Sequence, residues 1–166
     1  MILGMSVATF TTFHVVLSLI GILAGLVALF GMFGSKRLPK WTAVFLATTV
    51  LTSVTGYFFS RDHILPSHIV GAISLVMLAI AIYALYSRHL AGTWRWIYVV
   101  TAAVALYLNV FVGLVQTFLK VPAVNALAPT QSEPPFLIAQ GVVLLVFIVL
   151  AVVVLRSFHP RPDALA

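Results

Sequence analysis

The chain has 166 residues, of which 63% are hydrophobic and 7% are charged, and its formal net charge is +6. A soluble domain carries roughly a quarter of its residues as charges, so this composition excludes a water-soluble fold and makes the lipid bilayer the solvent for most of the surface. The absence of cysteine excludes disulfides, thiolate nucleophiles, iron–sulfur clusters and thiolate-ligated haem.

Five apolar runs follow one another along the chain, each with roughly the 17–25 residues that a transmembrane helix needs. We expect helices at about 7–33, 41–59, 65–86, 97–119 and 136–155. The first run lacks the basic start and the cleavage site of a signal peptide, so we expect it to be retained. The predicted fold class is therefore all-α: one polytopic, five-helix membrane domain over residues 1–166.

The basic residues predict the orientation of this domain. Five spans place the two termini on opposite sides, and one side then carries seven of the nine Lys and Arg residues. Basic loops stay in the cytoplasm, so we expect the N-terminus outside and the C-terminus inside. A basic excess held in short loops indicates contact with anionic lipid rather than with nucleic acid. The seven residues are Lys36, Arg37, Lys40, Arg88, Arg95, Arg156 and Arg161.

The connection over residues 120–135, KVPAVNALAPTQSEPP, differs from the short loops between the other runs. Its prolines and small polar residues argue against a continuous helix. A loop of this length in a compact domain is often functional or forms an interface. The alternative is that it only joins helix ends that are not adjacent.

Polar groups gather in the predicted outer half of the membrane. Tyrosine hydroxyls aside, His14 and His68 are the ionisable groups that the apolar runs contain, and such groups are functional candidates. From the rise of a helix we expect both histidines in the outer half, together with Gln116 and Gln140, while Asn109 lies near the middle. The sequence thus predicts a polar pocket that opens to the outer side.

On the first helix His14, Ser18, Gly21 and Gly25 recur at helical spacing and share one face. Small residues on such a face allow the backbone of a neighbouring helix to approach closely. Alternatively, they leave room for a flat cofactor beneath a histidine ligand. Asn109 and Gln116 form a second polar stripe on the fourth helix, for which the alternative is hydrogen bonding between helices.

Two imidazoles from different helices at similar depth are able to ligate a haem iron on both faces. His14 and His68 are the candidate ligands of a haem b, with Gly21 and Gly25 beside the macrocycle. Each ligating imidazole needs a partner for its second ring nitrogen, and Ser18 or Asn109 is expected to serve. The alternative is that each histidine hydrogen-bonds across a helix interface or lies among the lipid headgroups.

No carboxylate falls within a predicted span, since Asp62, Glu133 and Asp163 all lie at or beyond the interfaces. Ion-coupled transport and proton pumping depend on buried Asp or Glu, so this absence argues against both. No nucleophile elbow, zinc spacing or phosphate-binding glycine loop is found either. We identify no catalytic residues, and the sequence favours a non-catalytic role.

Three segments carry a resemblance to known proteins: FHVVLSLIGILAGLVALFG, FLATTVLTSVTGYFF and LNVFVGLVQTFLKVPAVNALAPTQSEPPF. They resemble a group of small bacterial membrane proteins that are described as hypothetical. The resemblance implies a multi-pass fold and placement in the bacterial inner membrane, and it carries over no functional residues. Separately, His14, Gly21, Gly25 and His68 are loosely similar to the haem-bearing helices of membrane b-type cytochromes.

Three functional hypotheses remain open. The first is a non-catalytic accessory or assembly subunit, which uses its small-residue faces and its outer loop to bind a membrane-protein partner or a second copy of itself. The second is a haem b electron-transfer protein ligated by His14 and His68. The third is a transporter of small solutes or lipids that uses Asn109, Gln116 and Gln140.

Overall fold

The structure, a computed structural model, describes residues 1–59 and 66–160, and within them every regular element is helical. The long helices are α1 (Val7–Phe33), α2 (Pro39–Gly56), α3 (Pro66–Ile82), α4 (Trp94–Lys120) and α6 (Pro134–Ser157). A π-helical turn, η1 (Tyr83–Ser87), continues α3, and α5 (Pro122–Asn125) is a single turn. The five predicted runs therefore form helices, and their observed limits differ from the predicted ones by a few residues.

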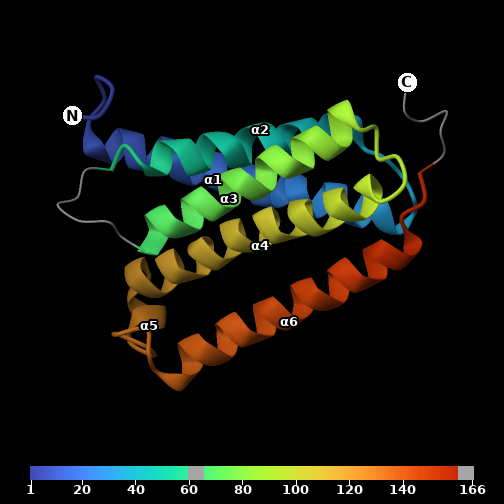
Figure 1. Ribbon diagram of the computed structural model, residues 1–166. Helices are drawn as coiled ribbons and strands as arrows, with labels where there is room; N and C mark the ends of the chain where they lie inside the picture. The colour runs from blue at the N-terminus through green and yellow to red at the C-terminus, as the bar shows by residue number, and fades with distance from the viewer. Residues whose placement is uncertain (60–65, 161–166) are drawn as a thin grey trace.

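Successive long helices run in opposite directions, so the bundle has two distinct ends (Figure 1). The Val7 end contains the starts of α1, α3 and α6 and the ends of α2 and α4. The Phe33 end contains the opposite termini of the same helices. Residues of either end that are far apart in the sequence are thereby brought side by side.

Local chemistry explains where the helices begin. The Ser6 hydroxyl accepts a hydrogen bond from the Thr9 backbone N–H and thus caps α1. Pro39 and Pro134 begin α2 and α6, where a residue without an N–H costs nothing because that N–H would have no partner in the helix.

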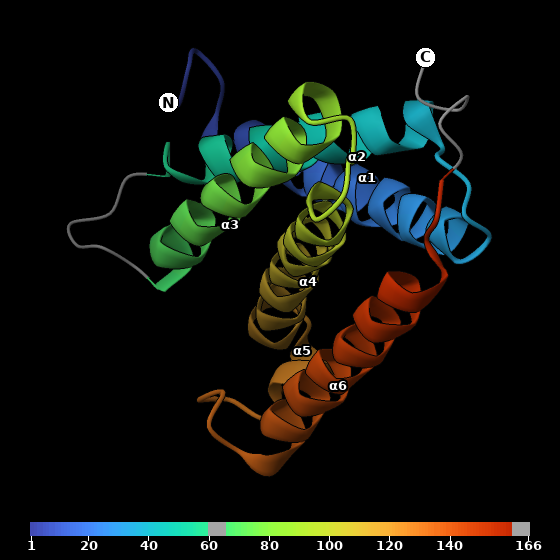
Figure 2. The same cartoon turned by 45° about the vertical axis from the view of Figure 1, so that its right-hand side comes forward.

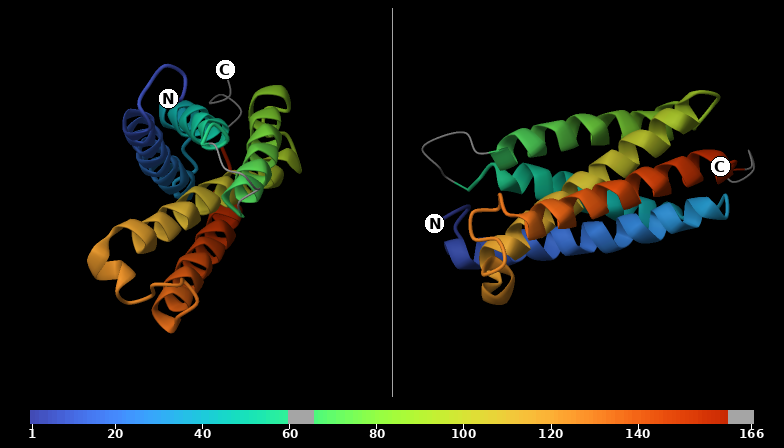
Figure 3. Two further views of the ribbon diagram at one scale, coloured as in Figure 1. Left: turned by 90° about the vertical axis from the view of Figure 1, so that its left-hand side faces the viewer. Right: turned by 90° about the horizontal axis from the view of Figure 1, so that it is seen from below.

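Helix α4 is the centre of the arrangement. It packs against α3, α1 and α2 on one side and against α6 on the other (Figures 2 and 3). Helix α6 stands apart from α2 and α3. Most of its side chains are exposed. The most extensive contact between helices is that of α1 with α2.

Four helices in the described part of the chain are long and apolar enough to cross a membrane: Val7–Phe33, Ser67–Ser87, Trp94–Lys120 and Pro134–Ser157. Length and composition therefore support four of the five expected spans. Helix α2 is not among them, because its 18 residues include Lys40 and a run of Thr and Ser side chains that lowers its mean hydropathy.

The apolar core lies toward the Phe33 end. Leu78, Ala105 and Leu106 are almost fully buried there, and the C-terminal segment reaches the same cluster through Phe158, whose side chain has no exposed surface. The Ser35 hydroxyl donates to the Ser157 carbonyl and accepts from the His159 N–H, so the α1–α2 loop and the end of α6 are joined.

Residues 120–135 fold into a compact connection rather than a plain linker. Phe118, Ala128 and Phe136 form a second small core, in which the two phenyl rings meet edge to face at 5.2 Å. The Gln131 side chain donates to the Val115 carbonyl, and the Asn125 side chain donates to the Phe118 carbonyl at the end of α4. The connection therefore closes the α4–α6 pair at the Val7 end.

A carboxylate organises the final turn of this connection. Glu133 accepts hydrogen bonds from the backbone and hydroxyl of Thr130 and from the backbone N–H of Ser132. Desolvation raises the pKa of the Glu133 carboxyl, but these hydrogen bonds outweigh it and hold the pKa below its usual value. Glu133 is thus ionised at neutral pH in the turn that precedes α6.

Candidate functional site

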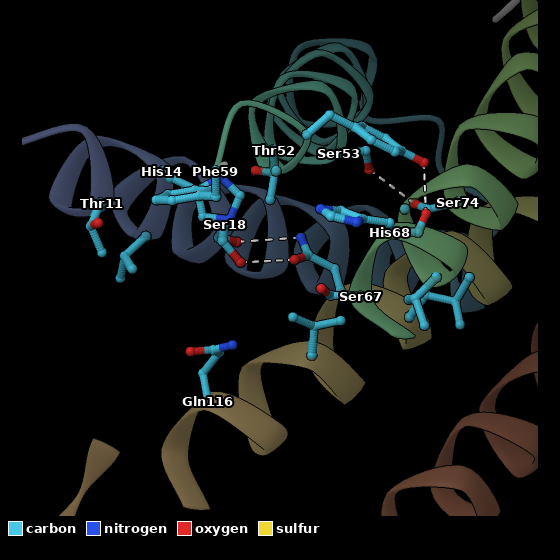
Figure 4. Close-up of a pocket in the computed structure, with 18 of the residues that line it drawn as sticks. Thr11, His14, Ser18, Thr52, Ser53, Phe59, Ser67, His68, Ser74 and Gln116 are labelled. Carbon is cyan, nitrogen blue, oxygen red and sulfur yellow. Dashed lines mark hydrogen bonds between the residues drawn. The ribbon is translucent and has the colours of Figure 1, made fainter. Parts of the chain in front are cut away.

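A cavity of about 420 Å³ lies at the Val7 end, between α1, α2, α3 and α4 (Figure 4). Its wall is mostly apolar, and polar side chains reach it from all four helices. A mostly apolar pocket with a few converging polar groups is the usual form of a small-molecule site. The polar lining comprises Thr11, His14, Ser18, Thr52, Ser53, Tyr57, Ser67, His68, Ser74, Asn109, Gln116 and Lys120.

His14 is held in one orientation by α2. Its Nδ1 lies 2.8 Å from the Thr55 hydroxyl oxygen, and that hydroxyl lies 2.7 Å from the Leu51 carbonyl oxygen. A hydroxyl has one proton, and a carbonyl can only accept, so the Thr55 proton goes to Leu51 and His14 Nδ1 must donate to Thr55. The edge contact with the Phe59 ring, at 5.3 Å, fixes the plane of the imidazole.

The proton on Nδ1 leaves the lone pair of the imidazole on Nε2. This atom has no hydrogen-bond partner in the part of the chain that the structure describes. His14, which lines the cavity, therefore keeps one ring nitrogen whose lone pair is available to accept a hydrogen bond or to ligate a metal. The side chain that binds the His14 ring is Thr55, and not Ser18 or Asn109 as expected, because those two side chains hydrogen-bond to each other.

Ser18 and Asn109 join α1 to α4 at the cavity floor. The Ser18 hydroxyl donates to Asn109 Oδ1 at 2.8 Å, and Asn109 Nδ2 donates to the Ser18 carbonyl at 3.4 Å. Asn109 is buried. This pair agrees with the alternative prediction that Asn109 forms hydrogen bonds between helices. The two side chains bind each other, so their polar groups are already paired at the point where a ligand would otherwise contact them.

His68 approaches the cavity from the opposite wall, on α3 (Figure 4). The Tyr57 ring stacks on the imidazole with centroids 5.4 Å apart, and the Tyr57 hydroxyl donates to the His68 carbonyl at 2.7 Å. Nearby, the Ser53 hydroxyl donates to Ser74 and links α2 with α3. Both predicted histidines thus line one cavity, from separate helices.

Three predicted site residues lie elsewhere. A β-carbon on Gly25 would come within 3 Å of the Leu106 and Phe45 side chains, and one on Gly21 would meet Thr49 and Asn109. The small-residue face of α1 is therefore filled by α2 and α4. Gln140 is buried outside the cavity lining, where its Nε2 donates to the Phe111 carbonyl of α4 at 3.4 Å.

Thr55 and Tyr57 are site residues that the sequence did not single out. The Thr55 hydroxyl donates to the Leu51 carbonyl of its own helix, and its oxygen also accepts from the His14 ring. Tyr57 follows the end of α2, and only the close approach of α3 gives its ring and hydroxyl their roles. The signal available in the sequence was that both residues lie near the end of the predicted run 41–59, in the half of the membrane where polar groups gather.

The charged side chain that lines the cavity is a basic one. Lys120 lines the cavity at the end of α4. Glu133 is the acidic residue of the described ranges, and it is not part of the cavity lining. Asp62 and Asp163 fall outside the described ranges. The same ranges contain no group of three or more potential metal ligands among His, Cys, Asp and Glu. The site thus combines neutral donors and acceptors with one ammonium group.

The chain was compared with protein-family models, with curated proteins and with solved structures, and none of them matches it.

Proposed function

We propose that the chain is an integral protein of the bacterial inner membrane, that all five long helices span it, and that the Val7 end faces outward. Helix α1 runs from the Val7 end to the Phe33 end and so does α3, both being apolar enough to span. The segment between them must cross back. Helix α2 is 18 residues long, about 27 Å at the usual helical rise, close to the thickness of the hydrocarbon layer.

The distribution of charge supports the outward direction of the Val7 end. Among the described residues the Phe33 end carries six Lys and Arg residues, and the Val7 end carries Lys120. Arg61 and Arg161 lie outside the described residues. Loops rich in Lys and Arg stay in the cytoplasm. The residues at the Phe33 end are Lys36, Arg37, Lys40, Arg88, Arg95 and Arg156.

Cysteine labelling in intact cells tests this orientation, because the chain has no cysteine of its own. A cysteine in place of Leu3 should react with a membrane-impermeant maleimide added outside. A cysteine in place of Lys40 should react only after the cells are made permeable. The reverse pattern would refute the orientation. Equal external labelling of both positions would show that α1, the helix between them, does not cross the membrane, and would refute the five spans.

Within this frame we propose that the protein binds a small amphipathic molecule in the cavity. The observation that supports this most directly is the convergence of polar groups from four helices on one mostly apolar space of about 420 Å³. A ligand with an apolar body and a polar head suits such a wall. The accessory-subunit hypothesis has less support, since the Gly21–Gly25 face that would receive a partner is covered by α2 and α4.

Filling the cavity tests ligand binding. Gly56 lines it, and a β-carbon there would meet only His14 Cε1, at 3.7 Å, so a Gly56→Leu side chain extends into the cavity without a backbone clash. We expect the wild-type protein, purified from its own membranes, to retain a small molecule detectable by native mass spectrometry, and Gly56→Leu to lose most of it.

Gly141→Leu is the matched control, because a β-carbon on Gly141 has nothing within 4 Å and this position is exposed on α6. This variant should retain the molecule. Retention by both variants, or a wild-type protein that carries nothing, would overturn the binding proposal.

A second candidate is haem b, and the geometry of His14 favours it. Histidines that ligate a metal almost always donate their other ring N–H to a neighbouring acceptor, as His14 does to Thr55. His14 and His68 would hold the iron, and the haem would supply one-electron transfer. The absorption spectrum of the same wild-type preparation decides: a Soret band supports haem, and a colourless preparation from haem-replete cells excludes it.

A further inference from the structure

A shallow groove of about 390 Å³ lies at the Phe33 end, on the far side of the bundle from the cavity described above. It runs between the start of α4 and the end of α6. Its polar wall consists of Arg95, Arg156 and His159, and its apolar wall consists of Trp96, Val152 and Leu155.

One of the two arginines is fixed within the fold. The Arg95 guanidinium donates to the Phe158 carbonyl and lies over the Trp96 ring, 5.8 Å from its centroid. Arg156, one residue before the end of α6, is exposed, and so is His159. The groove therefore combines a half-buried, oriented guanidinium with a second one that is accessible.

The charge of the groove has no counterpart in the described part of this chain. Glu133, the acidic residue of the described ranges, lies at the opposite end of the bundle, the Val7 end. Arginine presents a planar fork of donors that matches phosphate oxygens. Two guanidinium groups in one groove therefore call for an anion with several oxygens.

We propose that this groove binds the phosphate headgroup of an anionic phospholipid. The arginines would bind the phosphate, and an acyl chain would lie along Val152 and Leu155. The apolar wall continues onto the exposed side of α6 through Ile148 and Val149, which a lipid tail uses and a soluble phosphate does not. Basic pockets between membrane helices are known to bind acidic lipid headgroups in this way.

The test uses the purified full-length protein in detergent, with phosphatidylglycerol and phosphatidylcholine added separately and bound lipid counted by native mass spectrometry. We expect phosphatidylglycerol to be retained in preference to phosphatidylcholine. Arg156→Gln should reduce that preference about fivefold, the usual effect of one basic side chain near an anionic lipid. The exposed position of Arg156 lets the variant fold, which thermal unfolding of the same sample verifies.

Lys40→Gln is the matched control, since it removes one exposed positive charge at the same end but outside the groove. It should leave the lipid preference unchanged. An equal loss in both variants would mean diffuse attraction and overturn the proposal, as would equal retention of the two lipids. Inorganic phosphate that displaces the lipid and raises the unfolding temperature by itself would identify free phosphate as the occupant instead.

Discussion

Replacing Phe158 by alanine should destabilise the protein by about 3–5 kcal/mol, the usual cost of removing a fully buried phenyl ring. Phe158 follows the end of α6, its side chain has no exposed surface, and it packs in the core near the Tyr98 ring. Its carbonyl also accepts from the Arg95 guanidinium. The ring thus anchors α6 at the Phe33 end, and its loss leaves a cavity and frees the helix end.

Unfolding of the purified protein in a denaturing detergent titration measures this effect, and limited proteolysis near the C-terminus should become faster in the variant. Phe13→Ala is the control, since the Phe13 ring on α1 is exposed and its loss leaves no internal cavity. If both variants unfolded at the same detergent concentration, the conclusion that Phe158 anchors α6 would be refuted.

Replacing Gly25 by alanine should destabilise the bundle by about 1–3 kcal/mol, although alanine is the better helix former. The added β-carbon would lie 2.6 Å from Leu106 Cδ1 and 2.8 Å from Phe45 Cδ2. Both neighbours are buried, with 1% and 3% of their surfaces exposed, so neither has free space to move into. Helices α1, α2 and α4 would have to separate.

Gly113→Ala is the comparison that isolates this packing effect. Gly113 also lies within a long helix, but its added β-carbon would meet only Ile22 Cδ1, at 3.8 Å, an ordinary contact. Helix propensity then dominates, and stability should stay the same or rise by up to about 1 kcal/mol. If the two substitutions shift the unfolding midpoint equally, close packing at Gly25 is not what limits residue size there.

Much of the fold could be predicted from the sequence, because a bilayer imposes simple rules on it. Exclusion of charge from long apolar runs predicted the helices, and α1 has the predicted limits of Val7–Phe33. The run that became α2 is a helix as well, but its hydroxyl groups and Lys40 set it apart from the four strongly apolar helices. The rise per residue also predicted that His14, His68, Gln116 and Gln140 would lie toward the same end.

The tertiary structure decided which of these groups meet. Helical spacing fixes the depth and the face of a side chain on its own helix, but the rotation and tilt of each helix against its neighbours come from packing. Because of this packing, Gly25 is in tight contact with α2 and α4, and Gln140 lies at the α4–α6 interface. The same packing places Thr55 within hydrogen-bond distance of His14. It likewise buried Phe158, which lies beyond the last apolar run and which periodicity could not assign to any helix face.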